Sequence, residues 1–255
     1  MTDRSIVFDR AAEYYDRTRG YPDSVGDQVA ELLCHAGALG PESTVLEVGV
    51  GTGRIALPLA TRVRRVVGVD LSRPMLARLA GKPGSDRVRR VLADASALPV
   101  ADARFDAVVS LHLFHLLPAW QRAIAEVRRV LAPHGRYLSA ADQQLLPELW
   151  EEAYAGMVKR THVGVAHDDW DFPLRFGFRA DGEPHTLRYP VRVAFEQFLA
   201  DLEARVWSIT WSMADDEHAQ LVHNMRAAII RRYGSMSSVL DVERTVTVRV
   251  FAPAG

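Results

Sequence analysis

Short apolar runs alternate with amphipathic segments through the first half of the chain. Apolar positions three and four residues apart favour a helix, whereas short continuous or alternating runs favour a strand. Strands are predicted over 44–48, 65–69, 88–93, 105–110 and 136–140. Helices are predicted over 54–61, from Ser72 onward, and over 118–131. Continuous apolar strands that alternate with helices indicate an α/β fold with a parallel sheet covered on both faces.

The second half of the chain is less regular. Helices are expected over 146–158, 194–205 and 214–233, a strand over 185–193, and a loop over 161–184. The segment 243–251 alternates polar and apolar residues, which is typical of a strand with one wet face. Such a strand added to a parallel sheet gives a mixed sheet.

Composition narrows the class of protein. The 255 residues have a net charge of −1, so no basic field favours nucleic acid. Cys34 is the only cysteine, which excludes an internal disulfide and a cysteine-based zinc site. The polar segment 1–10 is unlike a signal peptide, and no apolar run reaches membrane-spanning length, so we expect a cytoplasmic protein without membrane contact. His162, His167 and Asp168 lack paired ligand spacing, and no metal is expected.

The strongest motif follows the first predicted strand. Gly49, Gly51 and Gly53 stand at alternate positions before a helix, where glycine lets the backbone turn tightly and approach a ligand. Asp70 closes the second strand, in the position that accepts ribose hydroxyls in dinucleotide-binding folds. One register of the glycines fails the dehydrogenase pattern, because Arg54 stands where a small residue packs, whereas the next register satisfies it. The glycines alone therefore fit three alternatives. The turn could bind a nicotinamide dinucleotide, it could bind S-adenosylmethionine, or it could bind no ligand.

Two acidic positions favour S-adenosylmethionine. Glu47, at the carboxyl end of its strand, suits a cationic amino group and would repel a pyrophosphate; the alternative is a carboxylate that caps local N–H groups. Asp94, after the third strand, suits the exocyclic amine of an adenine, with the Ala95 N–H donating to a ring nitrogen.

As a set, these motifs resemble the class I S-adenosylmethionine-dependent methyltransferases of the type 11, small-molecule branch. The resemblance covers about residues 8–142 and includes Leu98-Pro99, Phe105-Asp106 and the segment 126–135, in which His134 replaces the usual glycine. It implies a Rossmann-like, doubly wound, mostly parallel seven-stranded sheet with an antiparallel last strand, plus helical cap elements in the C-terminal half.

We expect one methyltransferase domain over 1–255. Its parts are an N-terminal helical segment over the cofactor (1–40), a cofactor-binding core (41–142), substrate-covering cap elements with one sheet strand (143–240), and a C-terminal strand (241–255). A monomer or a homodimer is expected.

The resemblance also implies roles for single residues. The glycines would wrap the methionine part and the sugar, with Glu47 near the amino group and Asp70 at the ribose. The remaining cofactor contacts would come from Leu71 and Met75 at the adenine, Asp94 and Ala95 at its edge, and Leu111 at the methionine end. In the aromatic N-terminal segment that many members of the family carry, Arg19 would pair with the methionine carboxylate, and Tyr14 or Tyr15 would lie over the sulfonium. Ordinary packing of an N-terminal helix is the alternative for the tyrosines.

The methyl acceptor is expected to be a small molecule. Relatives that methylate amide or exocyclic nitrogens carry an Asn-Pro-Pro-Tyr type of motif after the fourth strand, whereas this chain has Leu-His-Leu-Phe-His over 111–115. His115 and His112 are the candidate general bases, because an imidazole titrates near neutral pH; a structural role is the alternative. Tyr21, Trp207 and Trp211 are the candidate substrate residues, although the tryptophans also suit the core of the C-terminal half.

Methyl transfer to an oxygen or nitrogen, with S-adenosylhomocysteine as product, is the function that the sequence favours. The alternatives are a protein that binds S-adenosylmethionine without transferring its methyl group, and a nicotinamide-dependent oxidoreductase.

Overall fold

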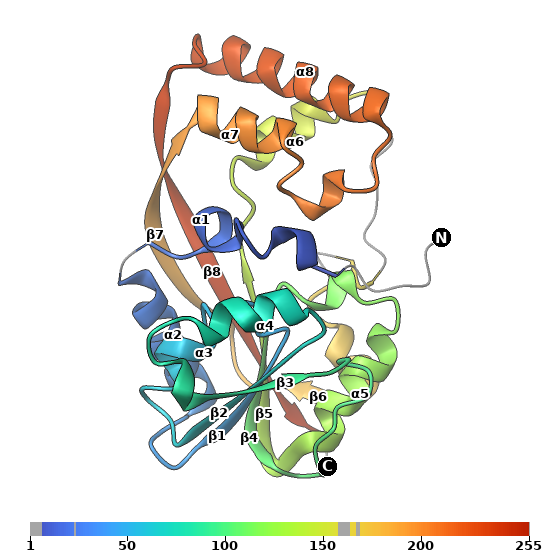
Figure 1. Ribbon diagram of the computed structural model, residues 1–255. Coiled ribbons are helices and arrows are strands. Elements are labelled where there is room, and N and C mark those ends of the chain that lie inside the picture. The colour runs from blue at the N-terminus through green and yellow to red at the C-terminus, as the bar shows by residue number, and fades with distance from the viewer. Residues whose placement is uncertain (1–6, 23, 158–163, 167–168, 255) are drawn as a thin grey trace. The chain divides into compact units, whose positions relative to one another are not determined.

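The computed structural model describes residues 7–22, 24–157, 164–166 and 169–254 (Figure 1). The chain divides into two compact units. The first contains the described residues up to Asp142, those from 164 to 187, and those from Val246 on; the second contains the described residues of 143–162 and 188–245. The chain thus leaves the first unit twice and returns to it each time.

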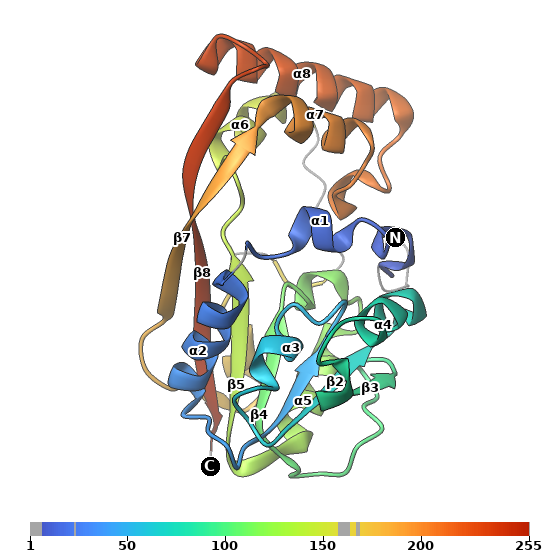
Figure 2. The same cartoon turned by 60° about the vertical axis from the view of Figure 1, so that its left-hand side comes forward.

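One sheet runs in the order β3-β2-β1-β4-β5-β8-β6, with β7 paired to β8. Figure 1 labels these strands, and Figure 2 shows β7 beside β8. Five neighbouring strands are parallel: β3 (Val88–Leu92), β2 (Arg65–Asp70), β1 (Thr44–Val48), β4 (Phe105–Leu111) and β5 (Leu131–Asp142). The last strand, β8 (Val239–Pro253), is antiparallel to β5 and to β6 (Phe178–Ala180); β7 covers His185–Ala194. The predicted α/β fold with a mostly parallel sheet and an antiparallel last strand is confirmed.

In the described part of the chain, the sheet has eight strands, one more than the seven expected. β6 lies within 161–184, a segment rich in Asp, Gly and Pro that predicts a loop. Three residues are too few to show a strand period. Phe178 is buried against the main core, and this burial places β6 at the edge of the sheet.

Two helices of the first unit precede β1, and three lie between its strands. They are α1 (Tyr15–Arg19), α2 (Val25–Gly37), α3 (Ala56–Leu59), α4 (Arg73–Ala80) and α5 (Trp120–Val130), with short 3₁₀ turns at Asp9–Ala11, Ser85–Arg87, Phe114–Leu116 and Phe172–Phe176. Ser72 caps α4, because its hydroxyl accepts from Met75 N–H. Ile124 and Val127 of α5 pack with Leu46 and Val48 of β1 in the main core.

In the first unit, two predicted elements differ clearly from the observed ones. The helix expected over 54–61 is only the four residues of α3, because the turn that precedes it extends through Ile55. The turn at Pro133 and Gly135 lies inside β5 and shifts its register on β4 between the pairs Phe105–Leu131 and Ala107–Arg136. A Cβ on Gly135 would lie 2.9 Å from the Phe105 oxygen, so glycine permits this close approach.

The second unit has its own core. Its helices are α6 (Pro147–Ala153), α7 (Phe195–Glu203) and α8 (Asp215–Tyr233), with a 3₁₀ turn at Ser208–Thr210. Leu149, Phe195, Leu202 and Leu221 are fully buried in that core. Among the described residues, no helix is both long enough and apolar enough to cross a membrane.

Candidate functional site

The turn after β1 is built from glycines in the left-handed region of backbone space. Gly49, Gly51 and Gly53 have φ of +76°, +54° and +83°, where a side chain is disfavoured. A Cβ on Gly49 would lie 2.9 Å from Leu113 Cδ1, and one on Gly53 would lie 2.3 Å from Leu79 Cδ1. Glycine is therefore needed at both ends of the turn, for backbone shape and for space.

Asp70, at the end of β2, holds this turn in place. Its Oδ2 accepts from Gly51 N–H at 2.8 Å, and its Oδ1 accepts from Ser72 N–H at 2.8 Å. Burial raises the pKa of the Asp70 carboxyl, while these backbone hydrogen bonds lower it. Because each carboxylate oxygen has two lone pairs, Asp70 retains acceptor capacity for ligand hydroxyls.

Glu47 is the most unusual group beside the turn. The residue is 2% exposed, and its Oε2 has no hydrogen-bond partner within the described parts of the chain. Burial raises the pKa of the Glu47 carboxyl well above its ordinary value, opposed mainly by the charge of Arg54 and also by a hydrogen bond from the Ala56 N–H. The hydrogen bond from the Ala56 N–H thus accounts for part of the acceptor capacity of this carboxylate. The oxygen without a partner is a buried acceptor suited to a cationic ligand.

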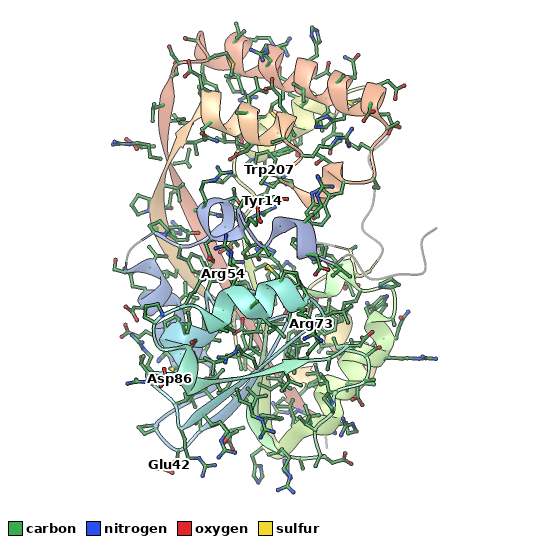
Figure 3. The ribbon with its side chains drawn as sticks, viewed as in Figure 1. Tyr14, Glu42, Arg54, Arg73, Asp86 and Trp207 are labelled. Carbon is green, nitrogen blue, oxygen red and sulfur yellow. The ribbon has the colours of Figure 1, made fainter. Side chains whose placement is uncertain are left out.

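Arg54 joins the turn to the ends of other elements. Its side chain is labelled in Figure 3. Its Nη1 donates to the Arg19 carbonyl at 2.7 Å and to Asp142 Oδ2 at 3.2 Å, and its guanidinium lies 5.0 Å from the centre of the Tyr21 ring. Tyr21 Oη donates to Asp142 Oδ1 at 3.0 Å. Sequence reasoning missed Asp142 as a site residue. The one local signal was an acidic residue two positions after the predicted fifth strand.

His112 and His115 lie where the sequence placed them, just past β4. Their rings meet edge to face, with centres 6.3 Å apart. His112 Nε2 accepts from the Asp142 N–H at 2.9 Å. Burial lowers the pKa of His112, against an opposing effect of Asp142. Its φ of +52° is uncommon for a residue other than glycine, and such constraint is typical of functional sites.

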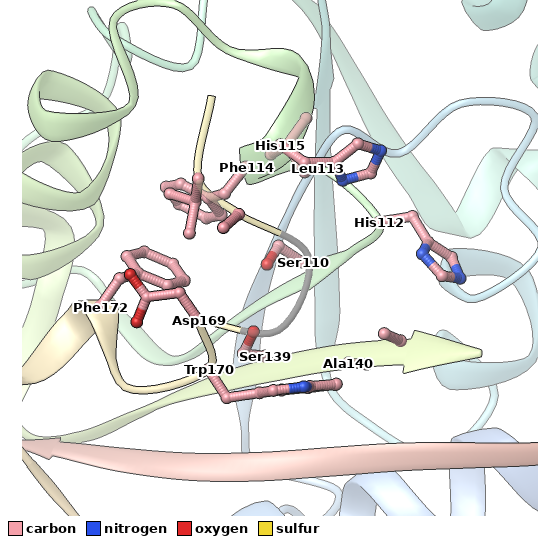
Figure 4. Close-up of a pocket in the computed structure, with 13 residues that line it drawn as sticks. Ser110, His112, Leu113, Phe114, His115, Ser139, Ala140, Asp169, Trp170 and Phe172 are labelled. Atoms are coloured by element: carbon pink, nitrogen blue, oxygen red, sulfur yellow. The ribbon is translucent and has the colours of Figure 1, made fainter. Parts of the chain in front are cut away.

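A pocket in the first unit opens beside these histidines (Figure 4). Phe114, Trp170 and Phe172 provide aromatic wall, and Asp169 contributes a carboxylate. Ser110 also lines it, with its hydroxyl 2.8 Å from Tyr137 Oη. The pocket lies at the carboxyl ends of β4 and β5, the edge of a parallel sheet at which ligands bind.

The N-terminal segment is fastened to the turn and to α4. Asp16 Oδ1 accepts from Thr52 Oγ1 at 2.6 Å and from Lys82 Nζ at 2.7 Å. Ser72 Oγ donates to Asp9 Oδ1 at 2.6 Å. The segment that carries Tyr14, Arg19 and Tyr21 is thereby held beside the glycine turn.

The other predicted adenine contacts differ in exposure. Met75 is buried, and its Cε would lie 3.2 Å from a Cβ on Gly51. Leu71 is 42% exposed at the surface. Asp94 is exposed and accepts from Ser96 N–H at 2.7 Å. Ala95 is partly buried against the main core. Leu111, predicted at the methionine end, is buried at the end of β4.

The tryptophans predicted at the substrate belong to the second unit. The Trp207 ring lies 5.5 Å from Trp150 and 5.2 Å from Phe198. Trp211 Nε1 donates to the Arg205 carbonyl at 2.7 Å. Packing within the second unit accounts for these contacts, and a role at the acceptor remains a prediction.

No metal centre is evident in the part of the chain that the structure describes, where no three His, Cys, Asp or Glu side chains gather. His162, His167 and Asp168 lie outside the described residues.

The sequence was also compared with known protein families and relatives. Residues 46–139 match the family model described as a methyltransferase domain. The malonyl-[acyl-carrier protein] O-methyltransferase of Geobacter sulfurreducens is 38% identical over 146 residues, which are 55% of this chain and 54% of that protein. Its counterpart in Halorhodospira halophila is 35% identical over 71% of this chain and 64% of its own length.

Solved structures of other proteins share the fold of this chain. The YcgJ protein of Bacillus subtilis superposes with a TM-score of 0.61 at 18% identity, over 89% of this chain and 99% of that one. The chain spans between 54% and 64% of the malonyl-[acyl-carrier protein] O-methyltransferases that it matches. Residues 46–139 therefore match a type 11 methyltransferase domain, the family that the sequence motifs resemble.

Proposed function

We propose that this chain transfers a methyl group from S-adenosylmethionine to an oxygen or nitrogen of a small molecule. The observation that carries the proposal is the unpaired oxygen of Glu47, buried beside a turn of left-handed glycines. A buried carboxylate oxygen is costly without a partner. The ammonium group of S-adenosylmethionine supplies one, whereas the pyrophosphate of a nicotinamide dinucleotide would be repelled.

The residues around the turn fit the other parts of this cofactor. Asp70 has acceptor capacity left for the ribose hydroxyls. Asp94 and the Ala95 N–H would read the adenine edge, with Leu71 and Met75 against its faces. Arg19 would pair with the carboxylate, because a guanidinium suits a planar anion. Leu111 and the Tyr14 ring would enclose the sulfonium, a cation that aromatic faces attract.

S-adenosylmethionine supplies an electrophilic methyl group on a sulfonium. The chain's contribution is then to align the acceptor and exclude water, because an in-line displacement depends on position. Trp170 and Phe172 would hold an apolar acceptor in the pocket, with Tyr21 as a further contact. An acceptor with a hydroxyl or ammonium proton must lose it on methylation, and His115 or His112 would take it. The O-methyltransferase relatives support oxygen as the acceptor atom.

The test is transfer of a labelled methyl group to small molecules. The protein is incubated with methyl-labelled S-adenosylmethionine and a small-molecule extract, beside the Glu47→Gln variant and heat-treated protein. The proposal predicts labelled small molecules with the unmodified protein, at least tenfold more than with Glu47→Gln, as for a lost ionic contact of about 1.4 kcal/mol or more. If the protein binds the cofactor but transfers no label to any molecule of the extracts, the result supports the alternative, a binding protein without transferase activity.

A further inference from the structure

Four segments that are distant in sequence meet at one buried carboxylate, Asp142. Its side chain is 1% exposed at the end of β5. Tyr21 from the N-terminal segment and Arg54 from the glycine turn donate to its two oxygens, at 3.0 Å and 3.2 Å. Its backbone N–H donates to His112, just past β4. Asp142 thus connects the segment expected over the cofactor, the cofactor turn and the histidine of the pocket.

The hydrogen bond to His112 decides which ring nitrogen carries the proton. A neutral imidazole has one N–H donor and one acceptor nitrogen. Nε2 accepts from the Asp142 N–H at 2.9 Å and lies farther, at 3.4 Å, from Asp142 Oδ2. The shorter contact is with a donor, and it favours an acceptor Nε2 with the proton on Nδ1. The charged groups that act on this ring are Asp142, which favours the imidazolium, and Arg54 and Arg19, which oppose it together with burial. A ring whose acceptor nitrogen is already engaged is a poor general base and a good hydrogen-bond donor.

The side chain of Asp142 acts on the cofactor end through Arg54. Arg54 is the largest electrostatic influence that favours ionisation of Glu47. Asp142 is the buried counterion of this guanidinium, since the Arg54 side chain is 10% exposed and the Asp142 side chain 1%. Without Asp142, the charge of Arg54 would stand unbalanced close to a site for a cation, and removing one partner of a buried ion pair has a large cost.

We propose that Asp142 is a positioning residue, which holds His112 as a hydrogen-bond donor, leaves the general-base role to His115, and neutralises Arg54 beside the cofactor. This inference rests on the proposed function. It differs from the sequence-based prediction, in which both histidines were candidate bases. S-adenosylmethionine carries one positive charge more than S-adenosylhomocysteine, so the loss of the Asp142 charge should weaken binding of the former more.

Two measurements test it, and the first is independent of any methyl acceptor. Nitrogen chemical shifts of ¹⁵N-histidine-labelled protein report the tautomer of each ring, and the His112 signals are assigned by their loss in His112→Gln. The proposal predicts the Nδ1–H tautomer for His112 in the neutral pH range. An Nε2–H tautomer, or an imidazolium at pH 7, would overturn it.

The second measurement is calorimetry of Asp142→Asn with S-adenosylmethionine and with S-adenosylhomocysteine. The ratio of the two dissociation constants should rise by about tenfold over that of the unmodified protein, as expected for one uncompensated charge nearby. Asp181→Asn breaks a carboxylate–arginine pair with Arg136 instead, so it should leave the ratio unchanged.

An unchanged ratio in Asp142→Asn contradicts the charge argument. If Asp142→Asn does not fold, the tautomer of His112 in the unmodified protein still decides the donor role. If the unmodified protein binds neither ligand, the proposed function itself fails, and that outcome is separate from both of the others.

Discussion

Replacement of Gly53 by alanine tests whether the glycine turn is fixed by backbone shape alone or also by packing. Gly53 has φ of +83°, and an added Cβ would lie 2.3 Å from Leu79 Cδ1 and 3.2 Å from Leu57 Cγ. Leu79 is fully buried in α4, so it can yield only by shifting the core. Gly84 is a matched control, because its φ is +77° and nothing lies within 4 Å of its added Cβ.

The magnitudes follow from these two positions. Alanine in the left-handed region costs about 1–2 kcal/mol, of which about 0.4–1 kcal/mol is recovered from the lower entropy of the unfolded chain. We therefore expect Gly84→Ala to cost about 1 kcal/mol. The contact with Leu79 adds an overpacking cost of about 1–3 kcal/mol, so Gly53→Ala should cost about 2–4 kcal/mol.

Equilibrium unfolding in urea measures both variants, compared at unchanged m-values. The double variant Gly53→Ala/Leu79→Ala supplies a cycle, because removal of the Leu79 side chain also removes the clash. It should be more stable than the sum of the single changes predicts, by about 1 kcal/mol or more. Equal losses in Gly53→Ala and Gly84→Ala, with an additive double variant, would refute the packing argument.

Three further predictions concern two carboxylates and a buried tyrosine. Asp70→Ala should weaken binding of S-adenosylhomocysteine by about 1–3 kcal/mol in calorimetry, and an unchanged affinity would remove Asp70 from the site. Because the Glu47 carboxyl keeps its proton to higher pH in the folded chain than in the unfolded one, stability should fall as pH rises from the ordinary pKa of 4.5 through the raised folded value. In urea unfolding, Glu47→Gln should show a flatter pH profile of stability and greater stability at pH 7 than the unmodified protein. Parallel profiles would contradict this. Burial raises the pKa of Tyr137 to about 12 from an ordinary value of 10.0, so the folded protein should lose about 3 kcal/mol of stability between these pH values. Tyr137→Phe should abolish this loss and cost about 1 kcal/mol of stability at pH 7. A loss that persists in the variant would assign it to another group.

The sequence predicts the parallel strands well because they are buried on both faces. All five residues of β1 are buried, and such a strand reads as a continuous apolar run. The same logic misses β6, which is too short to show a period. It also extends the helix at 54–61 too far, because the composition there is helical while the turn after Gly53 occupies the first positions.

The sequence likewise predicts one part of the candidate site and misses another. The glycines, Glu47 and Asp70 stand at recognisable spacing from predicted strand ends, so the local pattern points to them. Arg54 and Asp142 also lie near predicted strand ends, but their contact joins residues 88 positions apart in the sequence. Only the strand order that places β5 next to β4, and β4 next to β1, brings these ends together. Long-range pairing is therefore the part of the site that residue spacing cannot supply.

The central claim is that the glycine turn, with Glu47 beside it, binds S-adenosylmethionine and not a nicotinamide dinucleotide. Calorimetric titration of the unmodified protein with S-adenosylhomocysteine and, separately, with NADH tests it most directly. We predict saturable binding of S-adenosylhomocysteine and no heat of binding with NADH. Binding of NADH without binding of S-adenosylhomocysteine would contradict it.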